Sequence, residues 1–476
     1  MKRHVAKKPV LSASRREALC GLGAGFGSLA LSSLLQAEEP SAVNPNVPTL
    51  AKRCIFLFMY GGPCSVDTFD HKPELVKRNG QEVDIEIRRR SIQKQKLLAS
   101  PYPLRQHGES GLWCTDKLPH LAKHMDKLCL IKSLYSDSFA HGSALLQMNS
   151  GRFIQGSPTL GSWMTYGLGT ENENIPAYVV MLDPRGGPVS GRPNWGSGFM
   201  PAAYQGTQLR SKGEPIIDLA PASGMDRSMQ RRHIDTLRAL NEQHMHRRPG
   251  NSDLEARIAS YELAFQLQTS APEVMDISGE TRQTLDSYGI FDPKGDHKLS
   301  LGPAHFGRQC LIARRLVERG SRFVQIYSGG GHQQQNWDAH HGAKENIDIH
   351  GPEIDKPIAG LLTDLQQRGL LDETLVIWGG EFGRQPVSQN DGGRDHNPKG
   401  FLYWMAGGGV KGGHSHGELD ELGAEAAVDR HHIRDLHATI LHLMGMDHRK
   451  LTYFYGGLDH KLTGVQEAHV IHDVIA

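Results

Sequence analysis

Helix-forming segments and short apolar runs alternate along the second half of the chain, and this alternation restricts the fold more than any other feature. Strands that alternate with helices predict a mostly parallel sheet with helices on both faces. The apolar runs lie at 54–60, 128–131, 178–182, 323–327, 374–378 and 401–405, and the amphipathic segments at 305–319, 354–367 and 432–444. We therefore expect an α/β fold with this layering.

Three segments interrupt the regular pattern. Residues 74–106 are highly charged and predict surface helix and loop, and His414-Ser415-His416 in a glycine-rich stretch predicts an exposed loop. A Gly/Pro-rich stretch at 183–206 is too long for an ordinary connection and predicts an insertion or a site-lining loop. Residues 224–285 are polar and helix-forming, which predicts a helical insertion.

The first 37 residues have the pattern of an export signal. A basic start with Arg15-Arg16 precedes a weakly apolar run from Leu22 to Leu35, and Ala37 ends a plausible cleavage site. The run is short for a permanent membrane anchor, which is the alternative. The paired arginines predict recognition by the twin-arginine (Tat) export machinery. We expect residues 38–476 to form a single exported domain, periplasmic or extracellular.

The composition of this mature segment excludes some partners. Without residues 1–37, which hold six Lys or Arg and one Glu, the chain has 47 basic and 51 acidic residues and a net charge near −4. It has no basic block for nucleic acid and no later apolar stretch long enough for a stable membrane span. Its five scattered cysteines do not have the pattern of a disulfide framework, and one or two disulfide bridges remain an alternative.

Polar residues gather after two predicted strands. Fifteen of the 26 histidines lie at or beyond His332. Asp338 and His340 follow the strand that ends at residue 327. Glu381, Arg384, Asp395 and His396 follow the strand that ends at residue 378. Ligands bind at the carboxyl ends of such strands. Mixed carboxylate and imidazole groups predict a divalent metal site for Zn, Mn, Mg or Ca.

Five stretches resemble the bacterial family called domain of unknown function 1501, which is similar to sulfatases and alkaline phosphatases. They are SFAHGSALLQMNSGRFIQGSPTLGSWMTYGLGTEN, NWDAHH, DETLVIWGGEFGRQP, GRDHNPKGFLYWMAGGGVKGG and DLHATILHLMG. The resemblance covers about 52–474 and implies an alkaline-phosphatase-like α/β sandwich with a metal site at the strand ends. It implies Glu381 as a metal-binding carboxylate and Lys399 as a contact of the substrate anion. Asp338 and His340 match a Trp-Asp-x-His segment of the family.

Two departures from sulfatases matter. Their paired aspartates after the first strand are replaced by Tyr60-Gly61-Gly62, and Asp67 and Asp70 are the nearest acids, so Asp67 is a further candidate ligand. Their Cys or Ser that matures to formylglycine is replaced by His141, and neither the proline nor the arginine of that motif follows.

His141 stands at a predicted helix start, where free backbone N–H groups favour an anion. It may serve as a metal ligand, a general acid or base, or a nucleophile, and the first two are favoured because neither needs an unusual covalent intermediate. A histidine that only caps the helix is the other reading. Arg384 pairs either with a substrate anion or with a local carboxylate.

The function predicted from these features is metal-dependent hydrolysis of sulfate or phosphate esters, with a small-molecule or carbohydrate ester as substrate. The alternative is a metal- or glycan-binding exported protein on the same fold that does not hydrolyse esters, because a fold does not fix a function.

Overall fold

The computed structural model describes residues 47–87, 91–210, 226–247 and 273–476, and a nine-stranded sheet forms its centre. Across the sheet the strands are β14 (His414–His416), β6 (Leu128–Tyr135), β13 (Phe401–Ala406), β10 (Thr374–Gly379), β1 (Arg53–Met59), β9 (Phe323–Ser328), β7 (Tyr178–Met181) and β8 (Thr207–Leu209), and β17 (His431–His432) also pairs with β6. β1 is parallel to both of its neighbours, β9 and β10. β13 alone runs antiparallel, against β10 and β6. The predicted mostly parallel sheet is confirmed.

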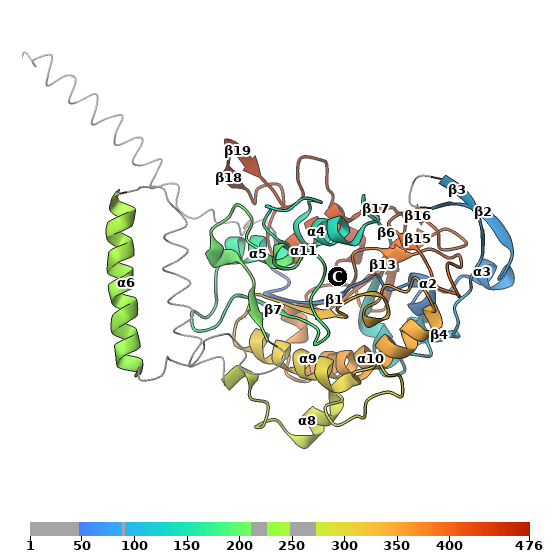
Figure 1. The fold of residues 1–476 in the computed structure, drawn as a ribbon, viewed down its shortest axis with the longest axis horizontal. Helices are drawn as coiled ribbons and strands as arrows, with labels where there is room; N and C mark the ends of the chain where they lie inside the picture. Colours follow the sequence, from blue (N-terminus) through green and yellow to red (C-terminus); the bar gives the residue numbers. More distant parts are fainter. Residues whose placement is uncertain (1–46, 88–90, 211–225, 248–272) are drawn as a thin grey trace, which may run out of the picture. The chain divides into compact units, whose positions relative to one another are not determined.

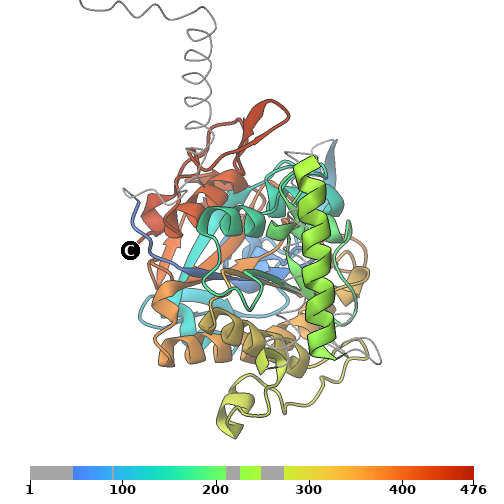
Figure 2. The same ribbon diagram turned by 90° about the vertical axis from the view of Figure 1, so that its left-hand side faces the viewer.

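Helices cover both faces of this sheet (Figure 1). The helices in the described residues are α2 (Ser65–Thr68), α3 (Pro73–Lys77), α4 (His141–Ser150), α5 (Leu160–Leu168), α6 (Arg227–Arg247), α8 (Arg282–Ser287), α9 (Pro303–Glu318), α10 (Ala343–Gln367) and α11 (Ile433–Leu443). α9 and α10 pack together on one face, and α4, α5 and α11 lie over the other, as Figure 2 also shows.

The alternation of side chains along β1 explains why both faces are covered. Ile55 and Leu57 belong to the apolar core under α9 and α10, whereas Phe56 and Phe58 belong to the core under α5 and α11. Successive side chains of a strand point to opposite faces, so a strand that is apolar at every position needs a cover on each side.

Small two-stranded sheets extend from this framework. They are β2 (Glu82–Ile87) with β3 (Ser91–Lys96), β4 (Leu104–His107) with β5 (Leu112–Thr115), β11 (Gly383–Arg384) with β12 (His396–Asn397), β15 (Glu418–Leu419) with β16 (Ala426–Val428), and β18 (Tyr453–Tyr455) with β19 (Leu458–His460). The expectation of surface helix and loop across 74–106 was therefore wrong for β2, β3 and the start of β4, whereas α3 and residues 98–103 agree with it. Val83 and Ile85 alternate with charged residues, which is the period of a strand with one apolar side.

Two other boundaries differ from the prediction. His414–His416 is a strand that pairs in parallel with β6, and His416 is buried rather than in an exposed loop. α10 begins eleven residues earlier than expected, at Ala343, because Pro352 and Pro357 lie within the helix instead of ending it.

Within the predicted helical insertion at 224–285 the structure describes α6, a non-helical stretch at 276–281 and the start of α8. The predicted signal at 1–37, with Arg15 and Arg16, lies outside the described residues. Within those residues no helix is long and apolar enough to cross a membrane. Cys54, Cys64, Cys114, Cys129 and Cys310 are all free and buried.

Candidate metal centre

The centre lies where the carboxyl ends of β9, β1 and β10 meet, the place at which open α/β sheets bind ligands. The turn after β1 allows loops to come close, because Gly61 and Gly62 have φ angles of 112° and 84°. A Cβ atom on Gly61 would lie 2.4 Å from the backbone nitrogen of Asp338. The glycine therefore lets the loop after β9 pack directly against the end of β1.

Four side chains from three parts of the chain converge there: His141, Asp338, His340 and His396. One possible ligand atom of each lies within 4.8 Å of those of the others. His141 is the first residue of α4, Asp338 and His340 lie in the loop after β9, and His396 lies in β12, beyond β10.

The three imidazoles point the same ring atom at one carboxylate. Nε2 of His141 lies 3.2 Å from Oδ2 of Asp338. Nε2 of His340 and Nε2 of His396 each lie 3.1 Å from Oδ1 of Asp338. The histidines thus surround the Asp338 carboxylate with their Nε2 atoms.

The other ring nitrogen of each histidine, Nδ1, lies within hydrogen-bond distance of an oxygen acceptor. Nδ1 of His141 lies 2.6 Å from Oε1 of Glu381, and Nδ1 of His396 lies 2.6 Å from the carbonyl oxygen of Phe139. Nδ1 of His340 lies 2.7 Å from Oε1 of Gln389. Because oxygen acceptors need a donor, Nδ1 carries the proton in each ring. A neutral imidazole then has its lone pair on Nε2, as in histidines that bind metals.

This arrangement fits a cation. A lone pair on Nε2 and a carboxylate oxygen repel each other unless a proton or a metal lies between them. Nε2 of His141 is buried and has no hydrogen-bond partner among the described residues. Buried polar atoms of that kind are rare, and a bound ion is one of the accepted explanations. The donor set of three imidazole nitrogens and one carboxylate suits Zn²⁺ or Mn²⁺ better than Ca²⁺ or Mg²⁺, which prefer oxygen.

Charges in the centre shift the pKa values of its members. Burial lowers the pKa of His141, but the nearby carboxylates of Asp338 and Glu381 outweigh burial and raise it to about 9. Burial and the positive charge of Arg384 lower the pKa of His396 to about 3. Burial opposes the ionisation of Asp338, yet the Arg384 charge and the histidine hydrogen bonds hold its pKa well below the usual range.

The side chain of Arg384 binds one of the candidate ligands and the backbone beside it. Its Nη2 donates to Oδ1 of Asp338 at 2.6 Å and also to the carbonyl oxygen of Gly61. Nε donates to the carbonyl oxygen of Gly62 at 3.0 Å, and Nη1 to that of Arg394 at 3.1 Å. The side chain is fully buried. Of the two roles expected for Arg384, these contacts fit pairing with a local carboxylate.

The other predicted site residues lie around or away from the four. Glu381 is fully buried beside His141, and also accepts from the backbone N–H of Gly61 at 3.0 Å. Asp395 lies 3.8 Å from Nδ1 of His340 and accepts from the backbone N–H of His396. The structure does not bring Asp67 or Lys399 into the cluster: Asp67 pairs with Arg394 at 2.7 Å, and Lys399 pairs with Glu86.

Sequence reasoning missed the groups that orient the ligands. Gln389 and the carbonyl of Phe139 carried no signal, because neither is a usual metal-ligand type and both act through a contact set by the tertiary fold. His437 lies outside the centre, and its buried Nε2 lies 2.7 Å from the carbonyl oxygen of Met148.

The fold and the site together define an α/β protein with a candidate three-histidine, one-aspartate metal centre at the strand ends. The chain belongs to the family described as protein of unknown function (DUF1501), whose model matches residues 51–475, as the sequence motifs predicted. Among curated proteins, none matches this sequence.

Several solved structures show low similarity to this chain. One is the lipoteichoic acid synthase LtaP from Listeria monocytogenes, at 9% identity over 89% of this chain and 78% of that one, with a TM-score of 0.38. Another is the PsFucS1 sulfatase from Pseudoalteromonas sp., at 11% identity over 88% and 71%, with a TM-score of 0.35. A third is a variant of TAB5 alkaline phosphatase with Mg bound, at 10% identity over 84% and 99%, with a TM-score of 0.34.

Proposed function

We propose that this chain is an exported, metal-dependent hydrolase of sulfate or phosphate esters that works without formylglycine. The observation that carries the proposal is the convergence of three Nε2 atoms on the Asp338 carboxylate, with every Nδ1 held by an acceptor. His141, Asp338, His340 and His396 would hold one divalent ion. Such an ion supplies a Lewis acid that polarises a phosphoryl or sulfuryl oxygen and lowers the pKa of a water molecule.

The entrance to the centre suits an anionic ester. α4 begins at His141 and has no side-chain cap at Ala140, so the free N–H groups of its first turn are available beside the centre. These N–H groups and the positive end of the helix dipole favour an anion. The side chains of His141, Asp338 and His340 are 18%, 14% and 21% exposed, so solvent and a small ligand can reach them.

The contacts of His141 favour a ligand role over a nucleophilic one. Its Nδ1 is engaged by Glu381, and its Nε2 faces Asp338 within the cluster. Glu381 fixes the orientation of the ring, and Arg384 fixes that of Asp338. The two buried residues thus position the ligands, while the substrate meets the exposed side of the centre and the first turn of α4.

A second function, metal or glycan binding without hydrolysis, is favoured by one feature of the centre. Four protein ligands are typical of a closed structural zinc site, whereas catalytic zinc sites commonly have three and leave a position open. A four-ligand site that admits no water would bind the ion without activating a nucleophile.

Metal analysis followed by turnover assays separates the two functions. The purified mature protein is expected to contain a divalent metal and to hydrolyse at least one of aryl phosphates, phosphodiesters and aryl sulfates. His141→Ala is expected to abolish that activity, while His469→Ala, at an exposed histidine, is expected to leave it unchanged. Bound metal without turnover on any ester would favour the binding function, and full activity in His141→Ala would contradict the proposed centre.

His141→Cys tests the claim about formylglycine. The proline and arginine of the maturation motif are absent around this position, so the introduced thiol is expected to stay unmodified in tryptic mass spectra and to confer no aryl sulfatase activity. An aldehyde at this position would contradict the claim.

A further inference from the structure

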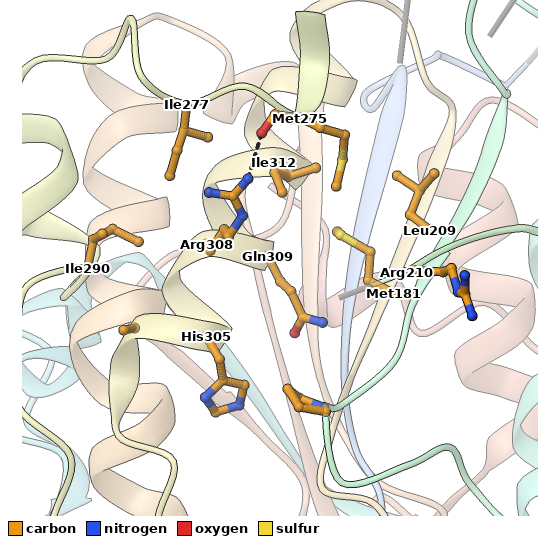
Figure 3. Close-up of a pocket in the computed structure, with 12 residues that line it drawn as sticks. Met181, Leu209, Arg210, Met275, Ile277, Ile290, His305, Arg308, Gln309 and Ile312 are labelled. Atoms are coloured by element: carbon orange, nitrogen blue, oxygen red, sulfur yellow. Dashed lines mark hydrogen bonds between the residues drawn. The ribbon is translucent and has the colours of Figure 1, made fainter. Parts of the chain in front are cut away.

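A second hollow lies away from the metal centre, at the edge of the sheet where β7 and β8 end. Its volume is about 330 Å³, within the range of small-molecule pockets. α9 forms one wall, β7 and β8 another, and the segment before and after α8 the third (Figure 3). The apolar lining comes mainly from Met181, Leu209, Met275, Ile277, Ile290 and Ile312. None of the four candidate metal ligands lines it.

The wall opposite the sheet is fixed by a side chain of α9. Nη2 of Arg308 donates to the carbonyl oxygen of Met275 at 2.9 Å, and Figure 3 shows this bond at the top of the hollow. The bond holds Met275 and its neighbour Ile277 against α9.

One polar atom inside the hollow has no partner. Gln309 is only 5% exposed, and its side chain reaches in from α9 among Ile312, Met181 and His305 (Figure 3). Its Nε2 donates to the carbonyl oxygen of Leu182 at 2.7 Å, which fixes the orientation of the amide. Oε1 of Gln309 is buried and has no hydrogen-bond partner among the described residues. An unpaired buried acceptor costs about 1–3 kcal/mol, so the site gains from a donor supplied by a ligand.

We infer that this hollow is a binding site for a small amphiphile, with an alkyl or aryl body and a neutral hydroxyl or N–H head. The body would displace water from the apolar lining, and the head would donate to Oε1 of Gln309. Pockets with apolar walls and a few placed polar groups bind ligands in this manner. The inference is independent of the proposed hydrolysis, because it rests on residues outside the metal centre.

Octanol and octane, titrated into the mature protein against a displaceable fluorescent probe, test the site. Octanol is expected to displace the probe, and the ratio of its displacing concentration to that of octane should rise about fivefold in Gln309→Leu, since one hydrogen bond contributes about 1 kcal/mol. Gln309→Leu removes the acceptor at similar size, so both ligands should still bind to this variant. Ile312→Trp fills the hollow and should abolish displacement by both ligands.

Gln366→Leu, at an exposed glutamine of α10 that does not line the hollow, is the matched control for Gln309→Leu and should bind octanol as the unchanged protein does. If Ile312→Trp does not fold, Leu209→Trp fills the hollow from the opposite wall and carries the same expectation. The inference is overturned if octanol does not displace the probe, if the filled variant binds as tightly as the unchanged protein, or if the octanol-to-octane ratio is the same in Gln309→Leu as in the unchanged protein.

Discussion

Glu381 offers the sharpest test of the metal centre, because it touches no candidate ligand atom that would face the metal. Its carboxylate accepts from Nδ1 of His141 through Oε1 and from the N–H of Gly61 through both oxygens, at 3.0 and 3.2 Å. In Glu381→Gln the new amide can take two orientations. If its oxygen accepts from Nδ1 of His141, its NH₂ group faces the N–H of Gly61, and two donors then face each other. The flipped amide instead places NH₂ against Nδ1 of His141 and moves the ring proton to Nε2. Either arrangement loses a contact and the negative charge.

We expect Glu381→Gln to weaken the binding of the metal. Changes to groups that orient metal-binding histidines typically weaken binding by about 10–100-fold, or about 1.4–2.8 kcal/mol. Chelator competition with Zn²⁺ or Mn²⁺ measures the dissociation constant in the unchanged protein and in Glu381→Gln. Glu373→Gln, at an exposed glutamate that pairs with Lys52, is the matched control and should not change it. An affinity within about twofold of the unchanged protein, in a folded Glu381→Gln variant, would refute this account of His141.

Three further predictions concern the ligands, the pH and the signal. Asp338→Asn and His396→Ala should each remove the bound metal, as measured by elemental analysis. The circular dichroism spectrum should stay unchanged, because strand-end loops contribute little to the core. An unchanged metal-to-protein ratio in both variants would contradict the site. The pKa of His141 is raised to about 9, so a proton must leave this ring as the metal binds. The metal affinity should therefore rise about tenfold per pH unit from pH 7 towards pH 9 and level off above pH 9. A metal affinity that does not change with pH, measured by calorimetry, would contradict this. Replacing both Arg15 and Arg16 with lysine should stop export, and full processing outside the cytoplasm would contradict the Tat assignment.

The fold could be predicted from the sequence because its signals are local. The apolar runs at β1, β9 and β10 are short and have no polar face, which is the pattern of strands buried on both sides. The prediction failed where local signals conflicted. Charged residues obscured the two-residue period of β2, and the predicted start of α10 at residue 354, two residues after Pro352, was eleven residues too late.

The candidate site could be predicted only in part. Asp338 and His340 follow β9, and His396 follows β10, the two strands that flank β1, so the carboxyl ends of these strands bring them together. The partners of charged residues depend on contacts between distant parts of the chain. Asp67 lies close to the end of β1 in sequence, yet its carboxylate binds Arg394, which is 327 residues away.

Lys399 shows the same limit. It follows β12 directly, but the hairpin of β2 and β3 supplies Glu86 as its partner. Motif spacing contains no information about a partner 313 residues away. The lysine would be free to meet a substrate anion only if that ion pair opened.

The fixed charges around the centre bear on the number of metal ions. Asp338, Glu381 and Asp395 contribute three negative charges, and the buried Arg384 returns one positive charge. One divalent cation brings this sum to zero, whereas two adjacent cations would leave an excess of two positive charges in a partly buried site, which is costly without further anions. Arg384 also occupies Oδ1 of Asp338, an oxygen that a second ion would need. These charges favour one divalent ion per chain, and under the proposed hydrolysis an ester anion would meet the N–H groups at the start of α4 rather than a second metal.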